Sequence, residues 1–130
     1  MIVLDASVAL ELLFLTPVGR LVKSRLFRSG ESLHAPHLID VEVAQVLRRY
    51  ALSGRVPIER CGQAFEDWRG LRVHRYPHEP LMRRIWTLRD NLTAYDAAYI
   101  ALAEGIGAPL ITHDAVLANA PGHGAQIELV

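Results

Sequence analysis

The sequence predicts an α/β protein, a three-layer α/β/α sandwich around a mostly parallel sheet of about four to five strands. Short apolar runs alternate along the whole chain with longer segments in which apolar residues recur every three to four positions. Strands and helices that alternate in this way are typical of parallel sheets joined by right-handed crossovers. The first run, Ile2 to Leu4, is apolar at every position, as expected for a strand buried on both faces.

Length and composition favour one ordinary globular domain over residues 1–130. A chain of 130 residues buries about two-thirds of the surface that its unfolded form exposes. No apolar run approaches the roughly 18 residues of a membrane span, and the N-terminus has no basic region followed by an apolar one. The single cysteine, Cys61, excludes an internal disulfide and a cysteine-based zinc site. We therefore expect a cytoplasmic protein that makes no membrane contact.

The expected strands are short, apolar and bounded by turn residues, prolines or carboxylates. Pro36 closes the second strand, and the fourth is entered through Pro109. The five expected strands are residues 2–4, 32–35, 73–76, 108–112 and 126–130.

The expected helices have recognisable starts and stops. Thr16 and Thr93 are suited to cap helices, Pro17 is tolerated in a first turn, and Gly30 and Gly54 are suited to end helices. The expected helices are residues 6–14, 17–29, 37–52, 57–71, 80–90, 93–104 and 115–119. In the fourth and fifth of these, the apolar residues expected to face the core are Ile58, Cys61, Phe65, Trp68, Met82, Ile85, Trp86 and Leu88.

The net charge of zero conceals an asymmetry along the chain. Residues 1–89 hold all 14 Lys and Arg against nine acids, whereas residues 90–130 hold five acids and no Lys or Arg. Thirteen of the 14 cations are arginine, whose planar fork suits phosphate. This charge distribution permits nucleic-acid binding without demanding it.

Three aspartates stand where helices begin. Asp5 and Asp114 directly follow expected strands, and Asp96 lies in the first turn of the helix that Thr93 caps. Each is explained on its own as a helix cap or as a favourable charge at the helix N-terminus. In a parallel sheet, however, the carboxyl ends of the strands share one edge, and ligands bind there.

Glu42 is harder to explain as a cap. It lies more than one turn into its helix, on an apolar stripe between Leu38 and Val46, and a charged residue facing a core requires a partner. Asp40, in the first turn of the same helix, is explained by the helix dipole. Of the 14 carboxylates, Glu42 and the three aspartates are those that this fold can bring together.

Grouped carboxylates favour a metal site over four independent caps. Two carboxylates about 4 Å apart repel each other by roughly 4 kcal/mol at an effective dielectric near 20. A divalent cation removes that cost, and carboxylate and water oxygens are the ligands that Mg²⁺ or Mn²⁺ prefers. Such a site activates water and stabilises an in-line phosphoryl displacement.

Four motifs resemble the PIN-domain ribonucleases, and most closely the VapC toxins of toxin–antitoxin pairs. They are IVLDAS, LIDVEVAQVLRR, NLTAYDAAYIALAE and LITHDAVLA, and they occur in the family's order over essentially the whole chain. The resemblance implies an acidic Mg²⁺ site, with Mn²⁺ as the other candidate ion. By position, its ligands would be Asp5, Glu42, Asp96 and Asp114, supported through hydrogen bonds by Ser7 and Thr112.

The same resemblance implies an activity and partners. The activity would be endonucleolytic cleavage of RNA by metal-activated water, and the partners a VapB-type antitoxin and a second copy of the chain in a homodimer. Many relatives carry another acid or amide shortly after the position of Asp114, whereas Val116 and Leu117 follow it here. A second metal ion would therefore be poorly held.

Two other functions compete with the nuclease. One is a non-catalytic RNA-binding or protein-binding module of the same fold, with acids that serve only as caps. The other is a phosphoacceptor receiver domain, which requires a lysine near its site late in the chain. No lysine follows Lys23, so the sequence disfavours the receiver domain.

Overall fold

A five-stranded parallel sheet forms the centre of the computed structural model, which describes all residues 1–130. Its strands are β1 (Ile2–Leu4), β2 (Leu33–Pro36), β3 (Val73–Tyr76), β4 (Leu110–Thr112) and β5 (Ile127–Leu129). The strand order is β3-β2-β1-β4-β5, and every neighbouring pair is parallel. The central position of β1 explains its uniformly apolar sequence.

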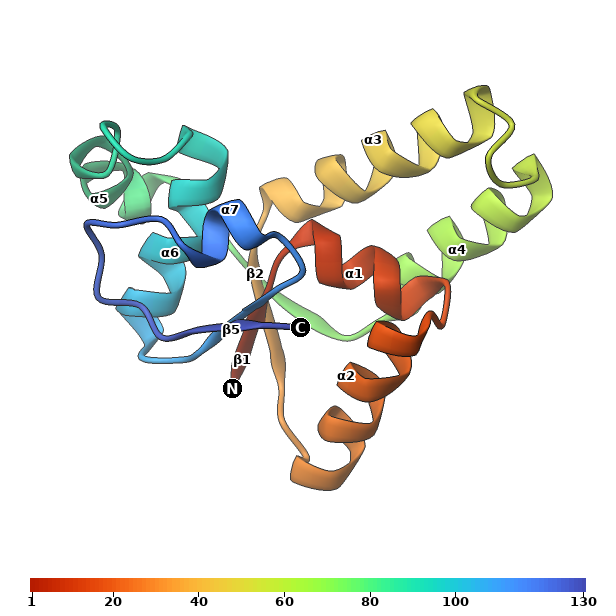
Figure 1. The fold of residues 1–130 in the computed structure, drawn as a ribbon, viewed down its shortest axis with the longest axis horizontal. Helices are drawn as coiled ribbons and strands as arrows, with labels where there is room; N and C mark the ends of the chain where they lie inside the picture. The colour runs from red at the N-terminus through yellow and green to blue at the C-terminus, as the bar shows by residue number, and fades with distance from the viewer.

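Helices cover both faces of the sheet, which confirms the predicted three-layer α/β/α architecture. In Figure 1, α1 to α4 lie to one side of the sheet and α5 and α6 to the other. The helices are α1 (Ala6–Leu13), α2 (Pro17–Ser29), α3 (Leu38–Leu52), α4 (Ile58–Gly70), α5 (Met82–Thr87), α6 (Ala94–Ile106) and α7 (Ala115–Ala118). None of these helices is long and apolar enough to cross a membrane.

The predicted elements agree with the observed ones except near the fifth helix. Instead of one helix over residues 80–90, a 3₁₀ turn, η1 (Glu79–Leu81), precedes α5, which ends at Thr87. The N–H of Leu88 is shared between the carbonyls of Arg84 and Ile85, a tightening of the last turn that ends the helix.

The core lies between the sheet and both helix layers. Ile2, Val3 and Leu4 are each at most 1% exposed, and small residues on α6 such as Ala97 and Ala101 let that helix pack closely on the strands. Four residues expected in the core are instead exposed: Ile58, Phe65, Met82 and Trp86. In α4 and α5 only a narrow stripe of side chains is buried against the rest of the protein, and the apolar residues beside that stripe are exposed to solvent.

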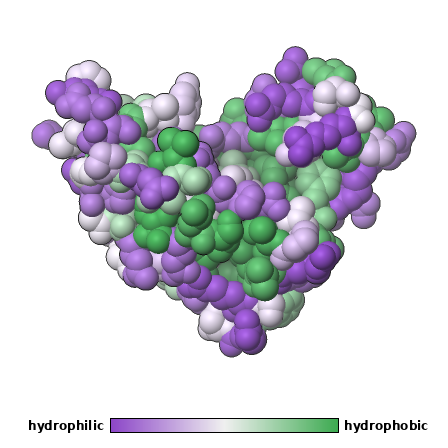
Figure 2. Space-filling model, viewed as in Figure 1, coloured by the Kyte–Doolittle hydropathy of each residue, from purple (hydrophilic) through white to green (hydrophobic).

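The carboxyl ends of the central strands open into a notch. Figure 2 shows the notch between two raised lobes, and by comparison with Figure 1 one lobe carries α3 and α4 and the other α5 and part of α6. Both Asp5, after β1, and Asp114, after β4, stand at this edge of the sheet. The fold therefore delivers these acids to a concave part of the surface.

Candidate active site

Asp5 is held by hydrogen bonds to both of its carboxylate oxygens. It caps α1, where Oδ1 accepts from the backbone N–H of Val8 at 3.1 Å and from the Ser7 hydroxyl at 2.5 Å. The Thr112 hydroxyl donates to Oδ2 at 2.5 Å. Asp5 is only 6% exposed, and burial raises its pKa, with the three hydrogen bonds opposing the rise. The charge of Asp114 raises this pKa further.

Ser7 and Thr112 also tie the end of β4 to the end of β1. The Ser7 hydroxyl accepts from the backbone N–H of His113 at 2.9 Å, and the Thr112 hydroxyl accepts from that of Asp114 at 3.0 Å. Asp114 in turn caps α7, because its Oδ1 accepts from the backbone N–H of Val116 at 2.8 Å. The cap functions predicted for both aspartates are therefore present.

Glu42 has a buried partner that the sequence analysis did not identify. The hydroxyl of Tyr99 on α6, which is 2% exposed, donates to Glu42 Oε1 at 2.5 Å. Burial raises the pKa of Glu42, and the charges of Asp96 and Asp5 add to the rise, whereas the hydrogen bond from Tyr99 opposes it. Burial also lifts the pKa of Tyr99 far above its usual range, so Tyr99 remains a donor.

Asp96 is the least restrained of the four acids. Its backbone N–H donates to the hydroxyl of Thr93, which caps α6, and this hydroxyl is also the one side-chain hydrogen-bond partner of its carboxylate. Burial raises the pKa of Asp96, and the charges of Asp114 and then Asp5 raise it further. With one such partner, its carboxylate keeps lone pairs for another ligand.

All four predicted acids line one cavity of about 430 Å³. They reach it from α3, from α6 and from the ends of β1 and β4. The lining comprises Asp5, Ala6, Ser7, Leu10, Glu11, Glu42, Val46, Arg49, Tyr50, Asp96, Tyr99, His113 and Asp114. Thr112 is fully buried and does not line the cavity. We refer to this space as the acidic cavity.

Sequence reasoning missed five polar members of this cavity: Glu11, Arg49, Tyr50, Tyr99 and His113. A spacing signal existed for two of them. Arg49 follows Glu42 by two helical turns on the same face of α3, and Tyr99 follows Asp96 by about one turn of α6.

The acids share a cavity without converging into a metal cage. No group of three or more His, Cys, Asp or Glu side chains is arranged closely enough to hold an ion directly. The raised pKa values of Asp5, Glu42 and Asp96 are what burial and mutual repulsion produce. A cavity lined by carboxylate oxygens whose negative charge burial and mutual repulsion make unfavourable fits a hard divalent cation.

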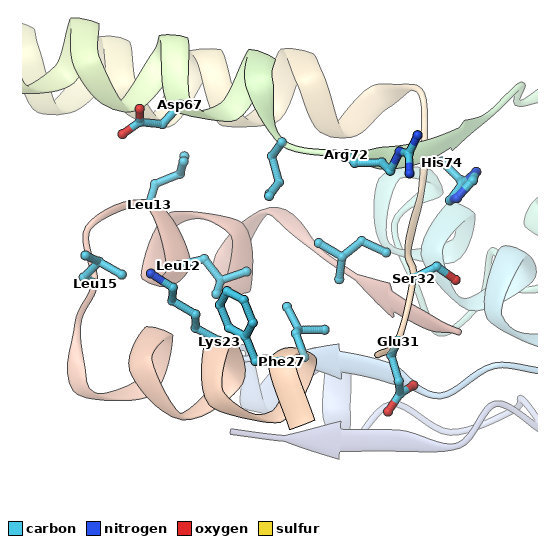
Figure 3. A pocket seen from close by; sticks show the side chains of 13 residues that line it. Leu12, Leu13, Leu15, Lys23, Phe27, Glu31, Ser32, Asp67, Arg72 and His74 are labelled. Carbon is cyan, nitrogen blue, oxygen red and sulfur yellow. The ribbon is translucent and has the colours of Figure 1, made fainter. Parts of the chain in front are cut away.

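A second cavity, of about 510 Å³, shares no lining residue with the acidic cavity. Figure 3 shows apolar side chains from α1 and α2 across its floor, with Phe27 projecting into it and Asp67 and Arg72 above. We call it the apolar groove. Two acids line the apolar groove, against five in the acidic cavity, so the acidic cavity is the candidate active site.

Comparisons with known proteins agree on one family. The PIN domain model matches residues 2–122. Ribonuclease VapC12 of Mycobacterium tuberculosis (strain H37Rv) is 45% identical over 130 residues, covering 100% of this chain and 99% of the relative. Ribonuclease VapC9 of the same strain is 44% identical over 119 residues, covering 92% and 90%. The crystal structure of VapBC2 from Rickettsia felis, bound to a promoter DNA fragment, superposes with a TM-score of 0.68 at 14% identity, covering 99% and 98%.

Proposed function

Because the chain belongs to the PIN-domain family, and within it to the VapC ribonucleases, we propose that it is a metal-dependent endoribonuclease and the toxin of a type II toxin–antitoxin pair. One observation carries the catalytic part of this proposal. Four acids from distant parts of the chain line one cavity, and three of them have raised pKa values. A cluster of this kind in a concave site is typical of functional residues.

The residues that would hold the ion are Asp5, Glu42, Asp96 and Asp114. Mg²⁺ is the proposed ion, with Mn²⁺ as the alternative, because all four residues offer carboxylate oxygens. When bound, a divalent ion activates water at neutral pH and offsets charge that develops on a scissile phosphate.

The surrounding groups orient these ligands before substrate arrives. Ser7 and Thr112 hold the two oxygens of Asp5, and Tyr99 fixes one oxygen of Glu42. Asp5 Oδ1 also accepts from Val8, so the lone pair left for an ion is on Oδ2, which accepts only from Thr112. Partners of this kind set ligand orientation and basicity. Asp96, whose one side-chain partner is Thr93, is less restrained and can adjust to the ion.

RNA cleavage and its metal dependence test the proposal directly. The purified protein should cleave total RNA with Mg²⁺, and an excess of chelator should stop the reaction. Asp5→Asn and Asp96→Asn should each abolish cleavage while circular dichroism shows a folded protein. If both variants cleave at the wild-type rate, the acids serve only as caps, and a non-catalytic RNA-binding or protein-binding module becomes the better description.

We assign the VapB-type antitoxin to the apolar groove. The Rickettsia felis structure contains VapB and VapC together. The groove is the larger of the two cavities described above, is apolar in its floor and is separate from the acidic cavity. Phe27, on α2, lines the groove yet remains 78% exposed, which marks it as an anchor for an apolar segment.

A charge introduced into the groove tests this assignment. Phe27→Asp should prevent co-purification with the antitoxin while RNA cleavage continues. Leu21→Asp is the matched control, because Leu21 is 70% exposed on the same helix and lies outside the groove. Equal antitoxin binding by both variants would place the antitoxin elsewhere. Light scattering of the isolated chain tests the homodimer that we also propose.

A further inference from the structure

The acidic cavity contains one guanidinium group, and that group has no partner within the protein. Arg49 lies in the last turn of α3, is exposed, and lines the cavity together with five acids, the four proposed ligands and Glu11. Its side chain makes no hydrogen bond, and no carboxylate oxygen lies within 4.0 Å of it. A cation among acids that pairs with none of them is available for an external anion.

Most other arginines already have a contact within the protein. Four form ion pairs: Arg25, Arg69, Arg75 and Arg84. Three donate to backbone carbonyls: Arg20, Arg60 and Arg89. The guanidinium of Arg55 lies over an aromatic ring. The arginines without such contacts are Arg28, Arg48, Arg49, Arg72 and Arg83. Of these five, Arg49 alone lines the acidic cavity.

The helix spacing separates Arg49 from the acids along one wall. Glu42, Val46 and Arg49 all line the cavity from α3. At 1.5 Å per residue, Arg49 lies about 10 Å farther along the helix axis than Glu42. In Figure 1, this end of α3 projects outward beside α4, away from the sheet. A polymer that crosses the cavity therefore meets the acids at one point and Arg49 at another.

We propose that Arg49 binds a backbone phosphate of the RNA strand other than the phosphate that is cleaved. The proposal rests on the ribonuclease function proposed above and identifies one of its substrate-binding residues. A guanidinium donates two parallel hydrogen bonds to a phosphate, which fixes the strand's orientation as well as its position. Because the cavity is otherwise acidic, a cation at its outer end also lowers the electrostatic cost of bringing a polyanion there.

The charge of the neighbouring segment supports this path for the strand. Residues 48–60 hold four arginines and one glutamate, a balance of +3. Tyr50, which follows Arg49, lines the same cavity, and the Arg55 guanidinium lies 4.7 Å from the centre of its ring. The basic tip of the α3–α4 lobe thus adjoins the acidic cavity through Arg49.

A purely structural role for Arg49 makes a different prediction. A cation in the last turn of a helix stabilises the helix through its dipole. In that case Arg49→Gln changes thermal stability and leaves RNA binding and its salt dependence unchanged. Arg48 is the matched control, because it is the neighbouring exposed arginine on α3 and lies outside the cavity.

The test measures binding and cleavage of an end-labelled 20-nucleotide RNA of random sequence. Binding is followed by fluorescence anisotropy at several salt concentrations, in an Asp96→Asn background so that the RNA stays intact. Arg49→Gln should weaken binding about tenfold and reduce the slope of log affinity against log salt by roughly 0.7, the value for one phosphate on a single strand. Arg49→Lys should keep the slope and lose part of the affinity, and Arg48→Gln should have a smaller effect on both.

Single-turnover cleavage in the otherwise wild-type chain separates the two proposals. The Arg49→Gln rate should fall about tenfold at low protein concentration and recover at saturation. The wild type should cleave and Asp96→Asn should not, which supports the ribonuclease. If Arg49→Gln then matches the wild type in cleavage rate and in salt slope, the inference about Arg49 is wrong and the proposed ribonuclease function is unaffected. Equal losses in Arg48→Gln and Arg49→Gln would also overturn it, because they indicate unspecific charge. Absence of wild-type cleavage refutes the proposed function, and the binding series still decides on Arg49.

Discussion

Replacing Asp96 by asparagine should stabilise the metal-free protein and remove most of its response to metal. The Asp96 carboxylate has one side-chain hydrogen-bond partner, the Thr93 hydroxyl, and an asparagine amide oxygen can keep that contact, so the change chiefly removes a charge. Burial raises the pKa of Asp96, and the charges of Asp114 and Asp5 raise it further, so its ionised form is less favourable in the folded chain than in the unfolded chain.

The size of this effect follows from the cavity. A sphere of the cavity's volume, 430 Å³, is about 9 Å across, and two unit charges at that separation repel by about 2 kcal/mol at an effective dielectric of 20. Asp96 is half-exposed, so solvent and salt reduce the gain on removing its charge to about 0.5 to 1 kcal/mol. For a chain of this size, that corresponds to a rise in Tm of about 2 to 5 °C.

Metal should stabilise the wild type far more than it stabilises Asp96→Asn. At a Mg²⁺ concentration of 100 times Kd, binding stabilises the wild type by about 2.7 kcal/mol, or about 10 °C in Tm. Asp96→Asn should show a much smaller rise over the same titration, measured by differential scanning calorimetry. Asp90→Asn is the matched control, because Asp90 is exposed and lies outside the cavity. A metal-free Asp96→Asn protein less stable than wild type, with an undiminished metal response, would refute the reasoning.

Three further outcomes follow from the contacts around the site. Tyr99→Phe removes the hydrogen bond to Glu42 and should weaken metal affinity by about 10- to 100-fold in the same thermal titration, without preventing folding. Gly19→Ala places a Cβ 1.9 Å from a carbonyl oxygen of α1 and should cost about 3 kcal/mol or more in urea unfolding, whereas Gly62→Ala, which meets nothing within 4 Å, should not destabilise the protein. Burial raises the pKa of Asp40, but hydrogen bonds from its Arg and Trp partners outweigh burial and lower it. The stabilisation therefore exists above the unfolded pKa of 3.8 and disappears as pH falls through the folded value, so Asp40→Asn should destabilise the protein at pH 7 and have little effect near pH 2.

The fold was predictable because its local signals agree with each other. An apolar run buried on both faces, as in Ile2 to Leu4, indicates a central parallel strand, and threonine caps such as Thr16 and Thr93 mark helix starts that the structure confirms. Burial on the outer helices was less predictable. Trp68 and Trp86 look equivalent in sequence, yet Trp68 is 2% exposed and donates to Asp40, whereas Trp86 is 69% exposed. Which face of a helix meets the protein depends on neighbours that local periodicity does not specify.

The candidate site was predictable to the extent that it depends on strand order. Asp5 and Asp114 follow strands that turn out to be adjacent, so their proximity follows from the topology. The Tyr99–Glu42 hydrogen bond was not predictable in this way, because it joins α6 to α3 across 57 residues and depends on the packing of the two helices. Asp40 shows the same limit. The dipole of α3 accounts for an acid there, but its Trp and Arg partners come from α4 and β3.

Capping and metal binding are compatible in these aspartates, and the geometry shows why. A cap occupies one oxygen of the carboxylate, as when Asp114 Oδ1 accepts from the backbone N–H groups of Val116 and Leu117. The remaining lone pairs can face the cavity, and the helix N-terminus favours the ionised form that a cation requires. Asp5 adds burial, which opposes ionisation, and two hydroxyl donors, which favour it. A nearby cation stabilises most strongly a buried carboxylate that donors hold in place and whose ionised form burial disfavours. The capping contacts of Asp5 are therefore part of what would make it the central ligand.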